Sequence, residues 1–157
     1  MLSQTLISIS NTATSRLDMW DRFINHIRAE KVLEVGVWKG TFASHMLKRC
    51  ESVTAYYMVD PWRKLDAWNK PLNEEDGHQE ETFRAAMEAT QFAENKRVVL
   101  RGVTTEVSDR IPDESLDFVY IDGDHTLRGI ATDLISVYPK VKPGGYLVGD
   151  DFEPSIW

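Results

Sequence analysis

The sequence predicts an α/β fold in which helices cover both faces of a doubly wound, mostly parallel sheet. Short apolar runs alternate along the chain with stretches of helical periodicity. The first, second and fourth of these runs lead into a glycine or an aspartate, as strands do at the ligand-binding edge of such sheets. The 157 residues suffice for one domain with its own core, and we find no internal repeat or linker.

The expected elements follow in a regular order. Helical spacing of apolar residues marks the ranges 15–29, 40–50, 77–95 and 126–141. Apolar, β-branched and aromatic runs mark strands at 31–37, 52–60, 97–102 and 115–122, and a turn leads into a fifth strand within 142–151. Residues 61–75 hold two prolines and two tryptophans and are typical of an irregular loop. The sheet core therefore spans 31–151 and is preceded by one helix.

Charge and composition exclude several classes of partner. Eighteen basic and 25 acidic residues give a net charge of −7, which repels phosphate backbones, and no basic stripe is present, so we expect no nucleic-acid partner. No apolar run reaches membrane-spanning length, and the N-terminus lacks the basic start of a secretory signal. Cys50 is the single cysteine, which excludes an intramolecular disulfide and fits a reducing compartment. The expected location is the cytoplasm.

The loop after the first strand, "VLEVGVWKGTFA" (32–43), indicates a nucleotide-type ligand. It places Glu34, Gly36 and Gly40 at a strand-to-helix turn. A dinucleotide fingerprint needs a second glycine so that pyrophosphate can approach the backbone, but that position holds Trp38 and the third glycine position holds Thr41. The loop therefore suits a nucleoside without phosphates better than a nicotinamide dinucleotide.

The pattern E-x-G-x-x-x-G after a first strand resembles the first motif of Rossmann-like class I S-adenosylmethionine (SAM) methyltransferases. The resemblance implies that Gly36 passes close to SAM, that Glu34 anchors the loop or the ammonium end, and that Asp60 binds the ribose hydroxyls. Asp60 alone would suit a nicotinamide ribose equally well. Trp62 covers the adenine, lines the acceptor pocket or closes a hydrophobic edge. The other residues that the resemblance assigns to SAM are Val37, Gly40, Gly102, Thr104, Thr105 and Asp122.

A second cluster of charge follows the fourth and fifth strands. In "FVYIDGDHT" (118–126), Asp122 directly follows the apolar residues 118–121. Asp150 and Asp151 end "YLVGDD". Neighbouring strands lie about 4.8 Å apart, so these carboxylates would converge and repel if the two strands are neighbours. A hard divalent cation such as Mg²⁺ would relieve that repulsion. The alternative is that both segments are polar turns, with Asp124 capping the following helix or orienting His125.

The stretch "DFVYIDGDHT…DLISVYPKVKPGGYLVGDD" resembles the macrocin-type and cephalosporin-biosynthesis-type O-methyltransferases, and the resemblance covers most of 31–151. It implies that Asp122, Asp150 and Asp151 bind the metal and that His125 is the general base. Histidine side chains in general exchange a proton near neutral pH, which suits the removal of a proton from an acidified hydroxyl.

The sequence therefore predicts Mg²⁺-assisted methyl transfer from SAM to a hydroxyl group of a small molecule such as a sugar, polyketide or catechol-like compound. Three alternatives remain: a SAM-binding or regulatory module without turnover, a metal-independent methyltransferase, and a nicotinamide-dependent oxidoreductase. The chain stops just after the fifth strand. Either further strands or a partner would complete that edge, so a homodimer is one expectation.

Overall fold

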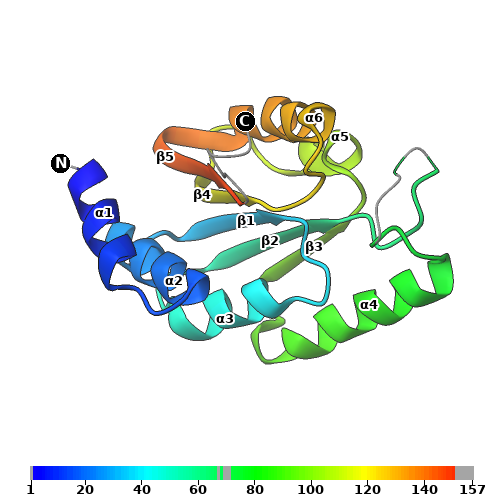
Figure 1. The fold of residues 1–157 in the computed structure, drawn as a ribbon, viewed down its shortest axis with the longest axis horizontal. Coiled ribbons are helices and arrows are strands. Elements are labelled where there is room, and N and C mark those ends of the chain that lie inside the picture. Colours follow the sequence, from blue (N-terminus) through cyan, green and yellow to red (C-terminus); the bar gives the residue numbers. More distant parts are fainter. Residues whose placement is uncertain (1, 67, 69–71, 151–157) are drawn as a thin grey trace.

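The fold is a five-stranded parallel sheet between two helical layers (Figure 1). The computed structural model describes residues 2–66, 68 and 72–150. The strand order is β3-β2-β1-β4-β5, so the chain winds outward from β1 in both directions. The strands are β1 (Lys31–Val35), β2 (Ala55–Asp60), β3 (Arg97–Arg101), β4 (Leu116–Ile121) and β5 (Val141–Gly149). The predicted doubly wound α/β fold is confirmed.

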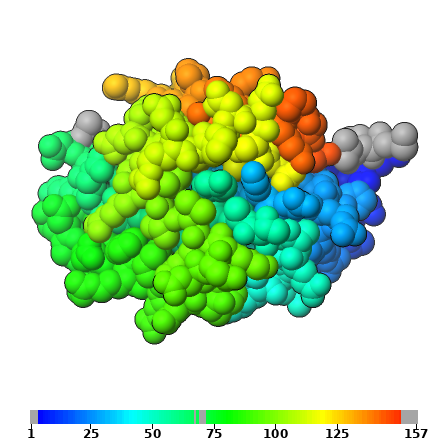
Figure 2. All heavy atoms as spheres, turned by 180° about the vertical axis from the view of Figure 1, so that it is seen from behind, coloured from blue at the N-terminus to red at the C-terminus, as the bar shows by residue number. Residues whose placement is uncertain are grey.

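The helices divide between the two faces of the sheet. Four lie on one face: α1 (Leu2–Thr12), α2 (Arg16–Ile27), α3 (Thr41–Arg49) and α4 (Asp76–Ala89). The other face carries α5 (Thr104–Val107) and α6 (Leu127–Val137). Short 3₁₀ turns follow three of the helices: η1 (Gln91–Ala93) after α4, η2 (Ser108–Arg110) after α5 and η3 (Tyr138–Lys140) after α6. The view from behind shows the same two layers, with α3 and α4 below and α6 above (Figure 2). None of the described helices has the length and hydropathy that a membrane span requires.

Alternate residues of each strand enter two separate cores, as the two-residue period of a strand requires. Val32 and Phe118 face α2, α3 and α4, whereas Leu33 and Val119 face α5 and α6. On the first face Trp20 of α2 packs on Phe118 with ring centroids 5.5 Å apart. Burial of strands on both faces explains why they read as continuous apolar runs in the sequence.

Two helices and one strand start differ from the sequence prediction. The structure adds α1 and the four-residue α5. The serine-rich sequence of α1 has weak helix propensity, but its Leu6 and Ile9 pack against the core. The turn expected at 142–145 lies inside β5, which begins at Val141. Gly144 has φ +82°, and the β4–β5 register shifts at this point. Gly144 and Gly145 therefore form an irregularity within the strand and not a turn before it.

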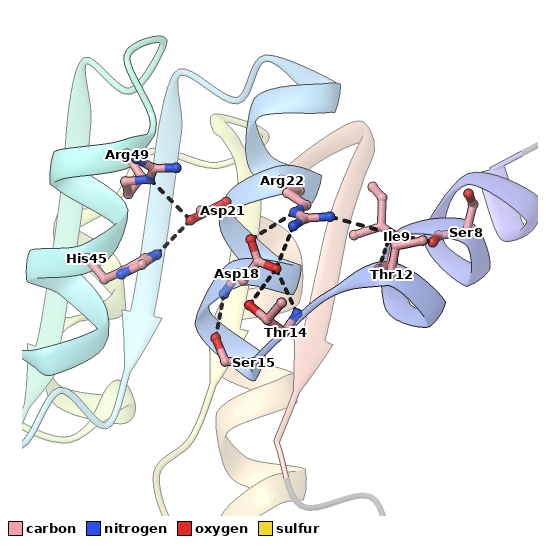
Figure 3. A network of polar contacts seen from close by, with 10 residues as sticks. All are labelled: Ser8, Ile9, Thr12, Thr14, Ser15, Asp18, Asp21, Arg22, His45 and Arg49. Atoms are coloured by element: carbon pink, nitrogen blue, oxygen red, sulfur yellow. Dashed lines mark hydrogen bonds and ion pairs between the residues drawn. The ribbon is translucent and has the colours of Figure 1, made fainter.

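Polar contacts hold α2 firmly on its neighbours (Figure 3). Ser15 caps the helix by accepting the backbone N–H of Asp18 at 3.1 Å, and Asp18 accepts the Nε–H of Arg22 at 2.8 Å. Buried Asp21 contacts His45 of α3 at 2.7 Å. The first turn of α2 is therefore capped, and the helix is tied to α3.

The outer edge of β5 pairs with no other strand among the described residues. A parallel sheet with an open edge strand exposes unpaired backbone groups. Completion of this edge by further strands or by a second copy of the chain stays a prediction.

Candidate functional site

The carboxyl ends of all five strands meet at one edge of the sheet, because every strand pair is parallel. Asp60 is the last residue of β2. Gly36, Asp122 and Asp150 directly follow β1, β4 and β5, respectively. The pairing of Ile121 with Gly149 confirms that the fourth and fifth strands are neighbours, as the convergence of their aspartates requires. The sequence thus predicted correctly which elements come together, and open α/β sheets bind their ligands at this edge.

Gly36 lets the loop after β1 pass directly against the end of β4. Its φ is +89°, its N–H donates to the carbonyl of Val59 at 2.9 Å, and a Cβ there would lie 2.0 Å from the carbonyl oxygen of Asp122. Val37 is buried, and its carbonyl accepts the N–H of Gly40, the N-cap residue of α3. Only glycine permits this contact between the two loops.

Glu34 is buried beneath the same loop. It is 2 % exposed, and the hydroxyl of Tyr56 donates to its Oε2 at 2.7 Å. Burial raises the pKa of Glu34 well above its usual range, the Tyr56 hydrogen bond lowers it, and the charges of Asp122 and Asp60 raise it further. A carboxyl group that favours its neutral form therefore lies under the glycine loop.

Asp60 ties together the loops that follow β1 and β2. Its Oδ2 accepts the N–H of Trp38 at 2.8 Å, and its Oδ1 accepts the N–H of Trp62 at 2.9 Å. Burial raises the pKa of Asp60, and these amides oppose that rise. Trp62 is fully buried, donates its indole N–H to the carbonyl of Trp38 at 2.9 Å and packs on Phe83. Of the interpretations of Trp62, its complete burial against Phe83 supports closure of a hydrophobic edge.

The residues after β3 point in different directions. Gly102 donates its N–H to the carbonyl of Asp60 at 3.0 Å. The Thr104 hydroxyl donates to Oδ1 of Asp133 in α6 at 2.6 Å, and both side chains are buried, whereas Thr105 is exposed. Thr104 therefore fastens α5 to α6. Sequence reasoning missed Asp133, and its only signal was an aspartate within an amphipathic helix.

Asp122 and Asp150 approach one cationic group, the guanidinium of Arg16. Arg16 pairs closely with Oδ2 of Asp150, and its Nη1 lies 3.7 Å from Oδ2 of Asp122. The backbone N–H of Asp150 donates to Ile121 at 3.0 Å, which keeps the end of β5 beside β4. Arg16 was missed from the sequence, because nothing in a one-dimensional pattern links the start of α2 with strands more than a hundred residues later.

His125 lies beside the same pair. Its Nε2 is 3.5 Å from Oδ1 of Asp122, and its side chain is 40 % exposed. Asp124 accepts the N–H and the hydroxyl of Thr126 at 2.9 and 3.0 Å. The cap of α6 is Thr126, which accepts the N–H of Gly129, so Asp124 supports that cap and does not form it.

A cavity of about 350 Å³ opens next to these groups, between the ends of β4 and β5 and the helix α6. Its walls are mainly apolar, and its polar groups come from Asp124, His125 and Asp150 at one end. The apolar lining residues are Ile121, Ile130, Leu134, Leu147 and Val148. Small-molecule sites in proteins have this size and this combination of apolar walls with few polar groups.

The predicted metal ligands are brought together only in part. Asp122 and Asp150 are neighbours, whereas Asp151 lies outside the described residues. Within the described ranges no group of three or more histidine, cysteine or acidic side chains has an arrangement that could hold a metal ion. The two carboxylates nevertheless converge on a positive charge, and carboxylate oxygens are the donors that Mg²⁺ prefers. The donor type therefore fits a hard cation.

Comparison with known proteins identifies the family. Residues 33–152 match the family model described as a methyltransferase domain. An uncharacterized protein of Sinorhizobium fredii is 26% identical over 136 residues, which cover 86% of this chain and 14% of that protein. An uncharacterized protein of Acanthamoeba polyphaga mimivirus is 26% identical over 125 residues, which cover 80% of this chain and 52% of its own length. The chain thus spans about half or less of these curated relatives.

Solved structures share the fold at low sequence identity. An O-methyltransferase from Bacillus cereus, solved in complex with SAH, superposes with a TM-score of 0.65 at 14% identity, covering 94% of this chain and 66% of that one. A protein assigned as a caffeoyl-CoA O-methyltransferase from Staphylococcus aureus gives a TM-score of 0.63 at 16% identity, covering 85% of this chain and 56% of that one. The match to the family model over most of the length shows that this chain belongs to the methyltransferase-domain family.

Proposed function

We propose that this methyltransferase domain transfers a methyl group from SAM to a hydroxyl of a small molecule with the help of Mg²⁺, as in the macrocin and cephalosporin-biosynthesis type of O-methyltransferase. The observation that carries the proposal is the meeting of Asp122, Asp150 and His125 beside an apolar cavity. The fold shared with an O-methyltransferase that binds SAH adds support.

The residues around the β1 loop fit a nucleoside. Gly36 brings the loop against β4 without a side chain, so a ligand at the edge meets backbone. Asp60 accepts the N–H groups of Trp38 and Trp62, and the N–H of Val37 also acts on it; a carboxylate has about four lone-pair positions, so a ligand hydroxyl could still be accepted. SAM, when bound here, supplies a methyl group on a positively charged sulfur. Thr104 acts in this proposal through the position of α5.

The acceptor would lie in the cavity with its hydroxyl toward His125. SAM would supply the methyl group that the acceptor oxygen takes up, with SAH as the product that leaves, and His125 would accept the hydroxyl proton. Asp122 and Asp150, together with Asp151, would hold Mg²⁺, which orients and acidifies a hydroxyl when bound. The apolar walls formed by Ile130 and Leu134 suit an acceptor with an apolar body.

The test is isothermal titration of the protein with SAM and with Mg²⁺, for the natural chain, Asp122→Asn and the exposed control Asp109→Asn. We expect SAM binding in the natural chain and the control, and a Mg²⁺ signal that only Asp122→Asn loses. SAM binding without any Mg²⁺ signal would refute the metal-assisted reaction. Absence of SAM binding in a folded natural chain would refute the function altogether.

A metal-independent methyltransferase is the second candidate, and the position of Arg16 favours it. The guanidinium already neutralises part of the charge of Asp122 and Asp150. In such an enzyme EDTA would leave methyl transfer to a hydroxyl acceptor unchanged, and His125 would still remove the proton. Comparison of the rates with EDTA and with Mg²⁺ separates the two candidates.

A further inference from the structure

Arg16 occupies an unusual place for a basic residue. It is the first residue of α2, directly after the cap Ser15. Positive charge at a helix N-terminus is opposed by the helix dipole. Its guanidinium instead points to the ends of β4 and β5, where it pairs with Asp150 and lies 3.7 Å from Asp122. The two carboxylates therefore explain a position that the helix itself disfavours.

The helix presents this guanidinium from a fixed base. Asp18 accepts the backbone N–H of Thr14 at 2.8 Å, and Asp21 joins α2 to His45 of α3 (Figure 3). One turn after Arg16, Trp20 packs on Phe118, which belongs to the strand that leads to Asp122. The backbone of Arg16 and the carboxylates are thus parts of one packed unit, and movement of the guanidinium requires only rotation of its side chain.

Asp122 and Asp150 directly follow two neighbouring strands, so their carboxylates bring negative charge together beside Arg16. The charge of Arg16 also reaches the buried Glu34, whose pKa it lowers. The Arg16 side chain is 49% exposed, whereas the carboxylates of Asp122 and Asp150 are 24% and 15% exposed. The guanidinium is therefore more exposed to solvent than either carboxylate.

We propose that Arg16 is an internal counter-cation that keeps Asp122 and Asp150 together when no metal is bound, and that a divalent cation must displace its guanidinium to bind them. This inference rests on the proposed metal-assisted function. Arg16 and a divalent cation would bind the same two carboxylates. The binding of one therefore excludes the binding of the other. Metal affinity is then set partly by Arg16, although Arg16 is not a metal ligand.

The experiment measures Mn²⁺ binding by the loss of the free-ion electron paramagnetic resonance signal, without any acceptor or turnover. It compares the natural chain with Arg16→Gln, Arg16→Lys and the control Arg22→Gln, which alters the same helix but contacts Asp18. We expect Arg16→Gln to bind Mn²⁺ about tenfold or more tightly, because the competing charge is gone. Arg16→Lys should fall between the two, and Arg22→Gln should match the natural chain.

Melting temperature with EDTA gives a second readout. Without metal, Arg16→Gln leaves two adjacent carboxylates without the guanidinium, so it should melt several degrees lower than the natural chain, and Mn²⁺ should restore it. Equal or weaker Mn²⁺ binding by Arg16→Gln would overturn the role of Arg16 and leave the metal site standing. No Mn²⁺ binding by any of the four folded proteins would overturn both proposals.

Discussion

Gly36 and Asp122 are so close that a Cβ at position 36 would lie 2.0 Å from the carbonyl oxygen of Asp122. The glycine loop after β1 and the loop after β4 are therefore in backbone contact. The carboxylate of Asp122 raises the pKa of the buried Glu34 and lies beside His125. Changes to either loop should be transmitted to the other.

Substitution of Gly36 by alanine should destabilise the protein by about 3–5 kcal/mol, because the new methyl group clashes with backbone that cannot rotate away. Gly144→Ala is the matched control: its φ of +82° is similar to the +89° of Gly36, but a Cβ there meets nothing within 4 Å. That control should lose only about 1–2 kcal/mol, the strain of the left-handed region. Urea unfolding followed by circular dichroism measures both, and equal losses would contradict the clash.

Glu34→Gln should stabilise the protein at neutral pH. Burial raises the pKa of Glu34 in the folded state above its usual value of about 4.5, so the folded state holds a proton that the unfolded chain releases. The free energy of unfolding should therefore fall as pH rises above that value, by up to about 1.4 kcal/mol per pH unit until the folded-state pKa is reached.

Glutamine stays neutral and can accept the Tyr56 hydrogen bond, so the gain from Glu34→Gln should grow with pH and vanish below about pH 4. Exposed Glu51→Gln serves as the control and should show no such trend. Urea unfolding across a pH series measures the difference. A gain from Glu34→Gln that does not depend on pH would contradict the raised pKa.

Thr104→Val should cost about 1–3 kcal/mol, because it removes the hydroxyl that donates to the buried carboxylate of Asp133. Thr105→Val, at an exposed neighbouring position, should change stability by less than about 0.5 kcal/mol. SAM titration of both variants then decides whether Thr104 also contacts the cofactor. An unchanged free energy of unfolding in Thr104→Val would show that α5 and α6 do not depend on this bond.

The Cys50 thiol should not react with iodoacetamide at pH 8 while the protein is folded. Its side chain is fully buried, and burial raises the pKa of the thiol to about 12, so almost no thiolate forms. In urea the thiol should react stoichiometrically. Mass spectrometry counts the added group, and rapid labelling of the folded chain would indicate that the contact between α2 and α3 opens easily.

The fold was predictable because its signals are local. The strands are apolar on both faces, so runs such as 116–121 stand out, and the parallel order places their ends at one edge whatever the side chains there do. α1 was not predictable, since its serine-rich sequence has weak helix propensity and becomes helical through the packing of Leu6 and Ile9 on the core. The start of β5 was misplaced because the glycines of a bulge resemble those of a turn.

The sequence by itself determined the class of fold, the strands that carry the site and the gathering of acidic residues at their ends, because hydrophobic periodicity and strand-end chemistry are written in neighbouring residues. Only the tertiary structure decided which groups those acids contact. It joined Arg16 to Asp122 and Asp150, Thr104 to Asp133, and Tyr56 to Glu34. Such pairs depend on the packing of helices against the sheet, and the geometry of that packing is set by the whole core and not by any local pattern.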